Sequence, residues 1–366
     1  MAQTGNLKTL PLDALHRQAG ARFGPFAGWS MPLTYPDGVM KEHLHTREAA
    51  GLFDISHMKL FLVSGPGAAS ALATACPFDP VSLGEGQSKY TFFLNDDAGI
   101  IDDLIITRLG PDRYIVVANA GNAEIDQRHL ELLRVGAAWT LAPLDRVFLA
   151  LQGPAAEAVL QDAGLDLSHL SFMQGCEPRK NWFASRSGYT GEDGFELALP
   201  VDEADAFAKV LLADQRVRWV GLAARDSLRL EAGLCLHGQD IAPDTSPVDA
   251  GLMWAIPKAL REKGSFIGAD ALRTQLARGR SRTRVGIKPE GRQPVRPGTK
   301  LFDEGGSEIG HVTSGGFGPS AGFPVAMGYV TGDATPGRRL YADVRGKRLP
   351  VEIHVLPFTP HRYRKG

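Results

Sequence analysis

The sequence predicts an α+β protein whose C-terminal part consists entirely of β-strands. Short apolar runs bounded by Gly, Asn, Asp and Pro indicate strands within residues 58–118. Segments with apolar residues at every third or fourth position indicate helices elsewhere before residue 240. From Val285 onward, short strand-like runs alternate with frequent Gly and Pro turns. A chain of 366 residues usually forms two or three domains.

The N-terminal half is expected to place one helix before a group of strands. Residues 39–50 have a helical pattern, and Gly51 is its expected end because glycine accepts the left-handed conformation that closes many helices. The residues from Asn95 to Gly99 have turn chemistry, since Asn and Asp bond their own backbone and Gly accepts positive φ. The expected strands, joined as an antiparallel meander, are 58–63, 89–94, 100–108 and 114–118.

A second mixed segment follows, and an all-β segment ends the chain. The expected elements are a strand at 148–152, a helix at 154–162, a hairpin at 182–199 and helices at 202–212 and 224–234. The basic run 278–284 is interpreted as a solvated linker, with a docking surface for an acidic partner as the alternative. The residues after it predict an all-β domain of roughly 80–100 residues.

Composition and charge restrict the class of protein. With 40 Lys and Arg against 41 Asp and Glu, the net charge of −1 argues against a general nucleic-acid surface. No apolar run approaches the roughly 18 residues that cross a membrane, and residues 1–13 predict neither a secretory signal nor a transit peptide. Ten histidines without an HExxH spacing predict no metal site. Three widely spaced cysteines suit reduced thiols and a cytoplasmic protein, with Cys235 as a small core residue.

The first candidate for chemistry is the pair Asp102–Asp103 within a branched apolar run. Adjacent strand residues face opposite sides of a sheet, so one carboxyl should point inward and the other outward. A buried carboxylate needs hydrogen bonds or a ligand, because burying it unpaired is costly. The alternative, which spacing alone favours, is an Asp that only accepts backbone hydrogen bonds at a turn or strand end.

The second candidate is the acidic, glycine-rich segment from Ser187 to Glu196. Within it, Glu192 and Asp193 have the pattern of a solvated turn. Glu196 lies between two apolar residues of a predicted strand. A carboxylate there could accept two parallel N–H bonds from an amidine-like edge, such as that of a pterin. The alternative, which sequence alone favours, is a strand residue on the solvent face.

Further polar and aromatic residues are weaker candidates. Arg225 and Asp226, with Arg229 and Glu231, open a predicted helix. Arg225 could make a two-pronged contact with a carboxylate or a ligand oxygen, and the alternative is salt pairing with acids of the helix. Asn119 and Asn122 follow a predicted strand, where a turn or helix cap is the simpler interpretation. The aromatic residues compatible with a flat ring ligand are Tyr90, Tyr189 and Trp254. Each alone is more often a core residue. The Gly-rich segment 313–318 lacks the spacing of a phosphate-binding loop.

Eight short segments match the sequence motifs of a known family in the same order, and they are spread along most of the chain. They are Phe26–Pro32, Gly51–Met58, Gly99–Leu104, Leu151–Pro154, Ser185–Leu197, Ala224–Glu231, Gly238–Asp240 and Thr313–Gly315. Each segment alone is weak, but the ordered set is specific. On these segments the chain resembles the aminomethyltransferase family, the T proteins of the glycine cleavage system.

The resemblance implies a three-domain cloverleaf around a central channel that binds folate. The implied domains are residues 1–55 with 148–258, residues 56–147, and a C-terminal β-barrel of residues 280–366. The implied reaction moves the methylene of an aminomethyl group, carried on the lipoyl arm of the H protein, to tetrahydrofolate. Ammonia is released and 5,10-methylenetetrahydrofolate forms. The resemblance implies neither a metal nor a covalent enzyme intermediate.

The resemblance also implies roles for single residues. Asp103 matches the acid that stabilises the cationic, iminium-like charge on the methylene and can accept a proton. Glu196 matches the acid that holds the pterin. Residues that match other positions at the folate site are Met58, Tyr90, Val117, Tyr189, Arg225 and Trp254, and the tail adds Arg362 and Tyr363.

Some positions depart from the family pattern. Lys59 stands where Gly is usual, His237 where Tyr is frequent, and Leu170 where some members place Tyr against the folate. The alternatives to the transferase are a related folate-dependent demethylase with another methyl or methylene donor, and a non-catalytic folate-binding accessory protein. The complete motif 188–194 favours the transferase over the demethylase, and the intact surroundings of Asp103 favour it over the accessory protein.

Overall fold

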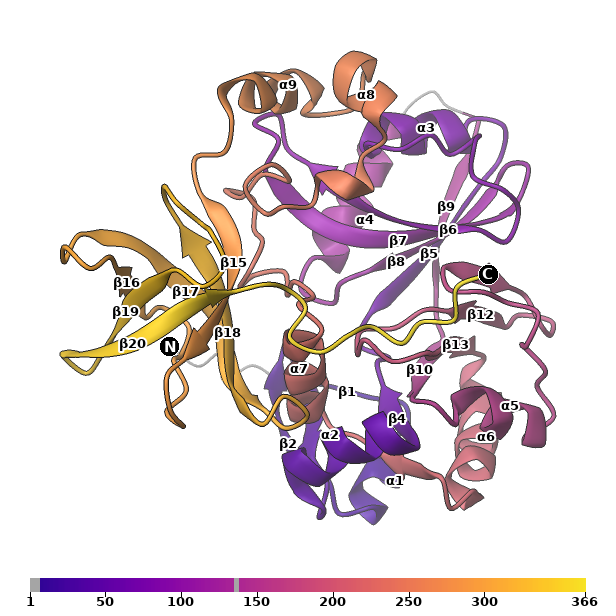
Figure 1. Cartoon of the computed structure of the whole chain (residues 1–366). Helices are drawn as coiled ribbons and strands as arrows, with labels where there is room; N and C mark the ends of the chain where they lie inside the picture. The colour runs from indigo at the N-terminus through magenta and orange to yellow at the C-terminus, as the bar shows by residue number, and fades with distance from the viewer. Residues whose placement is uncertain (1–6, 135–137) are drawn as a thin grey trace.

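The computed structural model describes residues 7–134 and 138–366, which form three lobes, each built on a β-sheet, around one central helix (Figure 1). A small additional sheet stands near the N-terminus. The mixture of helices and sheets and the closed barrel at the C-terminal end confirm the predicted α+β class. Within the described ranges, no helix is both long enough and apolar enough to cross a membrane.

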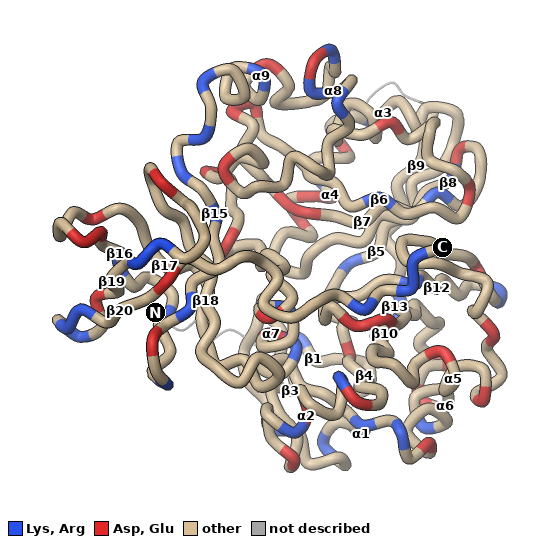
Figure 2. Tube along the Cα trace, in the orientation of Figure 1, with Lys and Arg blue, Asp and Glu red and all other residues tan. Residues whose placement is uncertain are grey.

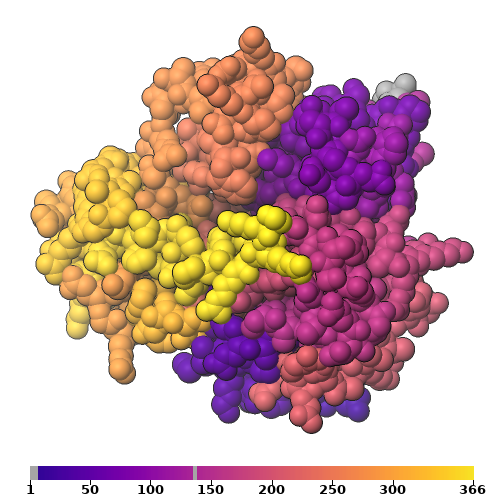
Figure 3. Space-filling view, turned by 45° about the vertical axis from the view of Figure 1, so that its right-hand side comes forward, coloured from indigo at the N-terminus to yellow at the C-terminus, as the bar shows by residue number. Residues whose placement is uncertain are grey.

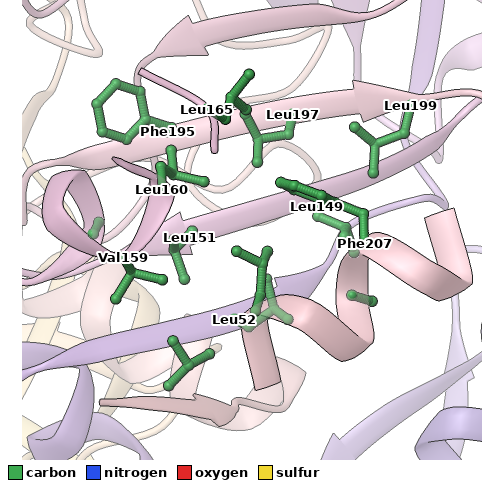
Figure 4. Close-up of a cluster of buried hydrophobic side chains, with 14 of the residues drawn as sticks. Leu52, Leu149, Leu151, Val159, Leu160, Leu165, Phe195, Leu197, Leu199 and Phe207 are labelled. Atoms are coloured by element: carbon green, nitrogen blue, oxygen red, sulfur yellow. The ribbon is translucent and has the colours of Figure 1, made fainter. Parts of the chain in front are cut away.

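The first lobe contains a six-stranded sheet in the order β11-β12-β13-β10-β4-β14. Its elements are β4 (Ala50–Asp54), β10 (Val147–Gln152), α5 (Ala156–Asp162), β11 (Gln174–Cys176), β12 (Phe183–Arg186), β13 (Gly194–Leu199), α6 (Val201–Ala213) and β14 (Val217–Trp219). Figure 4 shows Leu149 and Leu197 of the sheet packed with Leu160 and Phe207 of the two helices. Burying one such side chain contributes about 1.5–3 kcal/mol.

The N-terminal residues extend this lobe. Their elements are β1 (Lys8–Thr9), α1 (Asp13–Gln18), β2 (Arg22–Phe26), β3 (Trp29–Thr34) and α2 (Gly38–Glu48). The predicted helix 39–50 ends at Glu48, and Gly51 lies inside β4 instead of closing the helix. A Cβ at Gly51 would lie 2.4 Å from Oγ1 of Thr46, so glycine is needed there because α2 packs closely on β4.

The second lobe contains a five-stranded sheet in the order β6-β7-β8-β5-β9. Its elements are β5 (Lys59–Ser64), α3 (Ala68–Ala75), β6 (Ser88–Leu94), β7 (Ile100–Gly110), β8 (Arg113–Ala118), α4 (Ala123–Leu133) and β9 (Thr140–Leu144). All four predicted strands are present, and β6, β7 and β8 form the expected meander. However, β5 pairs with β8 and β9, because the connection through α3 carries the chain to the opposite edge of the sheet.

The two sheets share a core, and the central helix α7 (Leu222–Glu231) closes it. Phe148 of β10 is buried in one cluster with Leu60 and Val117 of the second sheet and Leu228 of α7. Every residue of β10 is buried, since α5 and α6 cover one face of its sheet and the second lobe covers the other. This packing fixes the position of β7, in the second sheet, relative to α7.

The segment after α7 packs on the second lobe. It contains η1 (Met253–Ala255), α8 (Lys258–Lys263) and α9 (Ala269–Arg278). Cys235 and Leu252 are buried in one cluster with Phe92 and Ile100 of the second sheet. The residues from 235 onward therefore belong with the second sheet by packing, although the sequence grouped residues up to 258 with the first. The domain boundaries themselves stay a prediction.

The third lobe is a closed barrel in the order β15-β18-β17-β16-β19-β20. Its strands are β15 (Thr283–Pro289), β16 (Lys300–Phe302), β17 (Glu308–Gly318), β18 (Phe323–Val330), β19 (Arg339–Val344) and β20 (Lys347–His354). Residues 355–366, called the tail below, run from the barrel across the surface of the first lobe, as the yellow atoms in Figure 3 show. The tail is basic near its end, where Figure 2 shows blue segments.

Candidate active site

The candidate site is built around β7, whose alternation sends its two aspartates to opposite sides of the sheet. Asp102 pairs in register with Phe93, which is buried against α3 and α4, and it is fully buried on that side. Asp103 pairs with Phe92, which packs against residues 235–272, and it is half-buried on the other side. The predicted division of the pair between two faces is therefore confirmed.

Asp103 is held by two neutral side-chain donors. The Tyr90 hydroxyl donates to Oδ2 at 2.9 Å, and the Asn119 amide donates to Oδ1 at 3.0 Å. Burial raises the pKa of Asp103 and the charge of Asp102 raises it further, while His237 and the Tyr90 hydrogen bond act in the opposite sense. No Lys or Arg in the described part of the chain pairs with Asp103. The backbone-turn alternative does not describe this carboxyl.

Two asparagines at the end of β8 connect the pair. The Asn119 amide lies 3.0 Å from Oδ1 of Asp102 and 3.0 Å from Oδ1 of Asp103, and the Asn119 backbone N–H donates to Oδ2 of Asp102 at 3.1 Å. The Asn122 amide lies 2.6 Å from Oδ1 of Asp102 and 2.8 Å from Nδ1 of His237. Asn122 stands at the N-cap of α4, but its side chain does not cap the helix. The cap interpretation was therefore wrong for Asn122.

An aromatic pair stands beside Asp103. The rings of Tyr90 and Trp254 are stacked with centroids 5.5 Å apart at 14°, and Phe92 packs edge-on against Tyr90 at 5.3 Å. Trp254 is 65% exposed, so it is not a core residue. Its ring, supported by the tyrosine that binds Asp103, offers a flat apolar surface to a ring-shaped ligand.

A second polar group surrounds Arg225 in the first half of α7. Its guanidinium lies over the Tyr189 ring at 4.8 Å, and Nη1 is buried without a hydrogen-bond partner among the described residues. Glu196, 6% exposed, accepts the Ser187 hydroxyl at 2.6 Å, so the solvent-face alternative for Glu196 is wrong. Burial raises the pKa of Glu196 and lowers that of Arg225, and the charge of each opposes the shift of the other.

This second group fits a ligand that carries both acceptors and donors. Leaving a buried guanidinium N–H unpaired is costly, so a bound acceptor at Arg225 would recover that free energy. Glu196 can accept N–H groups from the same ligand. The edge of a pterin, with a carbonyl oxygen beside N–H groups, has this pattern.

One buried residue near Arg225 was not assigned a role from sequence. His57 lies at the end of the Gly51–Met58 segment, and its Nδ1 has no partner among the described residues. Burial, and then the charge of Arg225, lowers the pKa of His57 to about 3, so the imidazole is neutral. Its place in a matching segment was the only signal that could have singled it out.

Two of the candidate ligand residues belong mainly to the core between the sheets. Val117 is 5% exposed and pairs in register with Leu60 and Ile105. Met58 is half-buried and packs against the same cluster. Their contact with a ligand stays a prediction.

The tail residues have protein partners. The backbone N–H of Arg362 donates to the Gly191 carbonyl at 2.8 Å, and its guanidinium lies 3.3 Å from Glu192. The ring of Tyr363 is stacked on Phe172 with centroids 3.9 Å apart at 5°. These contacts anchor the tail to the first lobe. That Arg362 and Tyr363 touch the ligand stays a prediction.

Other features of the surface do not resemble this site. An open cleft of about 450 Å³ near the start of β7 has a polar lining without aromatic residues, which includes Asp97, Asp244 and Arg278. Across residues 7–134 and 138–366, no cluster of His, Cys, Asp or Glu is arranged to hold a metal ion. The three cysteines are free, and Cys235 is buried as expected.

A separate group of buried charges lies along the C-terminal half of α7. Its helix members, Arg229 and Glu231, were candidates from the sequence, but their burial and their partners outside the helix were not predicted. Arg47 of α2 donates to Glu192 at 2.9 Å and to Glu231 at 3.1 Å. Glu192 is 2% exposed because Arg47 and Arg362 cover it. The prediction of a solvated turn was therefore wrong for Glu192.

The same helix connects to the barrel through a second arginine. Arg229 donates to Asp240 at 2.7 Å and to the Ser314 hydroxyl at 2.8 Å, and Thr313 donates to Asp240 at 2.5 Å. The segments Gly238–Asp240 and Thr313–Gly315 of the resemblance thus join α7 to β17. They hold two lobes together and, as the sequence predicted for the second, do not form a phosphate-binding loop.

Comparisons with known proteins agree over the full length. The family models described as the GCVT N-terminal domain and the glycine cleavage T-protein C-terminal barrel domain match residues 12–259 and 282–359. The crystal structure of glycine cleavage system aminomethyltransferase T from Bartonella henselae is 60% identical, with a TM-score of 0.97, and covers 98% of this chain and 100% of that one.

Curated relatives give the same result at lower identity. The mitochondrial aminomethyltransferase of Pisum sativum is 40% identical over 100% of this chain and 92% of its own length. That of Gallus gallus is 41% identical over 98% of this chain and 94% of its own length. Two matching family models, full-length relatives and a nearly superposable structure therefore show that this chain belongs to the aminomethyltransferase family, the T proteins of the glycine cleavage system.

Proposed function

We propose that this aminomethyltransferase moves the methylene carbon of an aminomethyl group, held on the lipoyl arm of the H protein, to tetrahydrofolate. The observation that carries the proposal is the Asp103 carboxyl. It is partly buried, accepts hydrogen bonds from Tyr90 and Asn119, and has no cationic partner among the described residues. The full-length relatives named aminomethyltransferase support the same reaction class.

In the proposed reaction, two bonds to the methylene carbon break and two form. The carbon loses its bonds to the amino nitrogen and to the lipoyl sulfur, and it gains bonds to N5 and N10 of tetrahydrofolate. The two protons displaced from N5 and N10 leave with ammonia and with the dihydrolipoyl thiol. As N5 attacks and ammonia departs, the carbon gains cationic, iminium-like character. A fixed carboxylate at Asp103 lowers the energy of that state and can accept a proton.

The second polar group would orient the acceptor. Glu196 would accept N–H groups of the pterin, and the unpaired Nη1 of Arg225 would donate to a pterin or benzoyl oxygen. The stacked rings of Tyr90 and Trp254 would flank the flat part of the ligand near Asp103. These contacts together would place N5 beside the methylene carbon, and positioning of this kind is a large part of the rate gain in two-substrate reactions.

The partner and the location rest on family membership. The lipoylated H protein is the proposed partner, and no nucleic acid or membrane surface is proposed. The cytoplasmic location stays a prediction from sequence. The relatives from Pisum sativum and Gallus gallus are named as mitochondrial proteins.

The test is a reconstituted turnover assay. The purified protein is incubated with tetrahydrofolate and aminomethyl-loaded H protein, and ammonia and methylenetetrahydrofolate are measured. Equal amounts of both products are expected, with little of either when tetrahydrofolate is omitted. Folate binding without turnover would identify an accessory protein, and turnover only with a free methylated amine or sulfonium would identify a demethylase. Either result would overturn the proposal.

A further inference from the structure

A third carboxyl group, Asp126, lies behind the Asp102–Asp103 pair and has no direct role in the proposed reaction. It stands on the first turn of α4 and is 0% exposed. Neither of its carboxyl oxygens accepts a hydrogen bond from a donor among the described residues. Its carboxyl is nevertheless within hydrogen-bonding contact of the Asp102 carboxyl.

The donors around Asp102 decide which of the two groups holds a proton. Asp102 accepts from the Asn119 backbone at 3.1 Å, from the Asn119 amide at 3.0 Å and from the Asn122 amide at 2.6 Å. Three donors stabilise the ionised form of Asp102. Asp126 has none of these donors, and two touching carboxyls in a buried site cannot both be ionised without large repulsion. The proton therefore belongs on Asp126.

We propose that Asp126 is a protonated carboxylic acid that donates to Asp102, and that it is a positioning residue for Asp103. The path between them is short, because one amide, that of Asn119, contacts an oxygen of both Asp102 and Asp103 at 3.0 Å. The part of this proposal that concerns Asp103 rests on the proposed function. The protonation of Asp126 does not.

Within residues 7–134 and 138–366, no Lys or Arg pairs with Asp126. The titratable groups that act on Asp126 are Asp102, Asp103 and Cys76, and His237 acts on Asp103. His129 lies three residues further along α4, where its ring packs on Phe93. Burial, followed by the charge of Asp102, raises the pKa of Asp126 to about 10. Burial also raises the pKa of Cys76 and lowers that of His129, so both are neutral. A proton on Asp126 changes the maximum charge of the cluster of Asp102, Asp103 and Asp126 from −3 to −2.

The proton on Asp126 has a consequence for Asp103. The charge of Asp102 raises the pKa of Asp103, which makes Asp103 a better proton acceptor, and a donor at residue 126 stabilises that charge. Without that donor, the negative charge beside Asp103 would be less well stabilised, and the repulsion that acts on Asp103 would weaken. The acidic limb of the pH–rate profile would then move to lower pH.

A matched pair of variants tests this relay, meaning the effect of Asp126 on Asp103 through Asp102 and Asn119. Asp126→Asn keeps a donor at this place, whereas Asp126→Leu has a similar volume and no donor. We expect kcat of Asp126→Asn to exceed that of Asp126→Leu by about ten-fold, and only the Leu variant to shift its acidic limb to lower pH. The KM for tetrahydrofolate should agree within about two-fold in both. A loss of kcat in Asp126→Asn as large as in Asp126→Leu, with equal melting temperatures, would overturn the relay.

The proton itself has a readout that needs no activity. Infrared spectra of protein with ¹³C-labelled aspartate should show the carbonyl stretch of a protonated carboxyl group near neutral pH. That band should disappear in Asp126→Asn and persist in the Asp103→Asn variant. If the band is unchanged in Asp126→Asn, the assignment of the proton is wrong. This result stands whether or not Asp103 proves essential for turnover, so the two proposals can fail separately.

Discussion

Two groups of buried acids in this protein are treated in opposite ways. Beside α7, Glu231 lies 3.1 Å from Arg47, and Asp240 lies 2.7 Å from Arg229. Beside β7, the side chains in the described residues that donate to Asp102 and Asp103 are the neutral Asn119, Asn122 and Tyr90, and Asp126 contacts Asp102. The first group balances its charge with arginines, and the second has no Lys or Arg partner in the described part of the chain.

The pKa values express this difference in physical terms. Burial alone would raise the pKa of Glu231, but the hydrogen bond with His43 and the charges of His43 and Arg47 bring it to about 2. At Asp103, burial and Asp102 raise the pKa, and no arginine opposes them. A compensated carboxylate stabilises the fold but has little attraction left for a new positive charge. An uncompensated one is available to a cationic reacting carbon.

The largest effect is expected at Asp103. Asp103→Asn removes the charge with little change in volume, so kcat should fall by about 10²–10⁴-fold. The melting temperature should not fall, because repulsion from Asp102 is relieved. The control is Asp112→Asn, an exposed acid on the turn after β7. If turnover and folate binding fall by the same factor, Asp103 is a binding residue. The lack of a cationic partner in the second group would then have no link to catalysis.

The next largest effect is expected at Arg229, in the other group. Arg229→Met leaves Asp240 buried without its cation and should lower the free energy of unfolding by about 3–5 kcal/mol. Urea unfolding measures the change. Arg218→Met is the control, since Arg218 is 54% exposed in its pair with Asp37 and should cost no more than about 1 kcal/mol. Equal losses of stability in the two variants would show that the buried Arg229–Asp240 pair does not stabilise the fold more than an exposed pair.

Glu196 should separate binding from chemistry. Glu196→Gln removes the charge that faces Arg225, and the Kd for tetrahydrofolate should rise by about ten-fold. The kcat at saturating folate should change by less than about three-fold, because Glu196 is not proposed to touch the reacting carbon. Fluorescence titration measures the Kd. An unchanged Kd would argue against a pterin contact at Glu196.

The two groups should also respond to pH in opposite senses. The pKa of Glu231, about 2, lies below its usual value of 4.5, so its stabilisation is present above pH 4.5 and is lost as the pH falls toward 2. The pKa of Asp126, about 10, lies above its usual value of 3.8. The stabilisation of the fold by protonated Asp126 is therefore fully present below pH 3.8 and is lost as the pH rises toward 10.

Chemical unfolding at a series of pH values checks this contrast. Between about pH 5 and about pH 8, Asp126→Asn should gain more than about 1 kcal/mol of stability relative to the wild type. The difference between Glu231→Gln and the wild type should stay constant over the same range, because Glu231 is ionised in both the folded and the unfolded states. A constant difference for Asp126→Asn would mean that Asp126 is ionised in the folded protein.

The smallest effect is expected in the tail. Tyr363→Ala removes the stacking on Phe172 and should cost about 1 kcal/mol of stability. The Kd for tetrahydrofolate should stay within about two-fold if the tail only anchors the barrel to the first lobe. A large rise in Kd with an unchanged melting temperature would instead support the predicted ligand contact.

Local chemistry determined much of this protein from the sequence alone. The two-residue period of a strand placed Asp102 and Asp103 on opposite faces before any fold was known. Turn residues and apolar spacing located the strands of the meander and the helices near 154–162, 202–212 and 224–234 to within a few residues. The order of eight short segments pointed to the family and, through it, to Asp103, Glu196 and Arg225.

Only the tertiary structure decided which polar residues are buried and what they meet. Arg47 bonds to Glu192, which is 145 positions away in the chain, and no sequence pattern near either residue predicts that pair. Gly51 is glycine because α2 packs on it, and Asp126 is a neutral acid because α4 brings it against Asp102. Periodicity and turn chemistry act over a few residues and can be read locally. Burial and charge compensation depend on surfaces that meet only after the chain has folded.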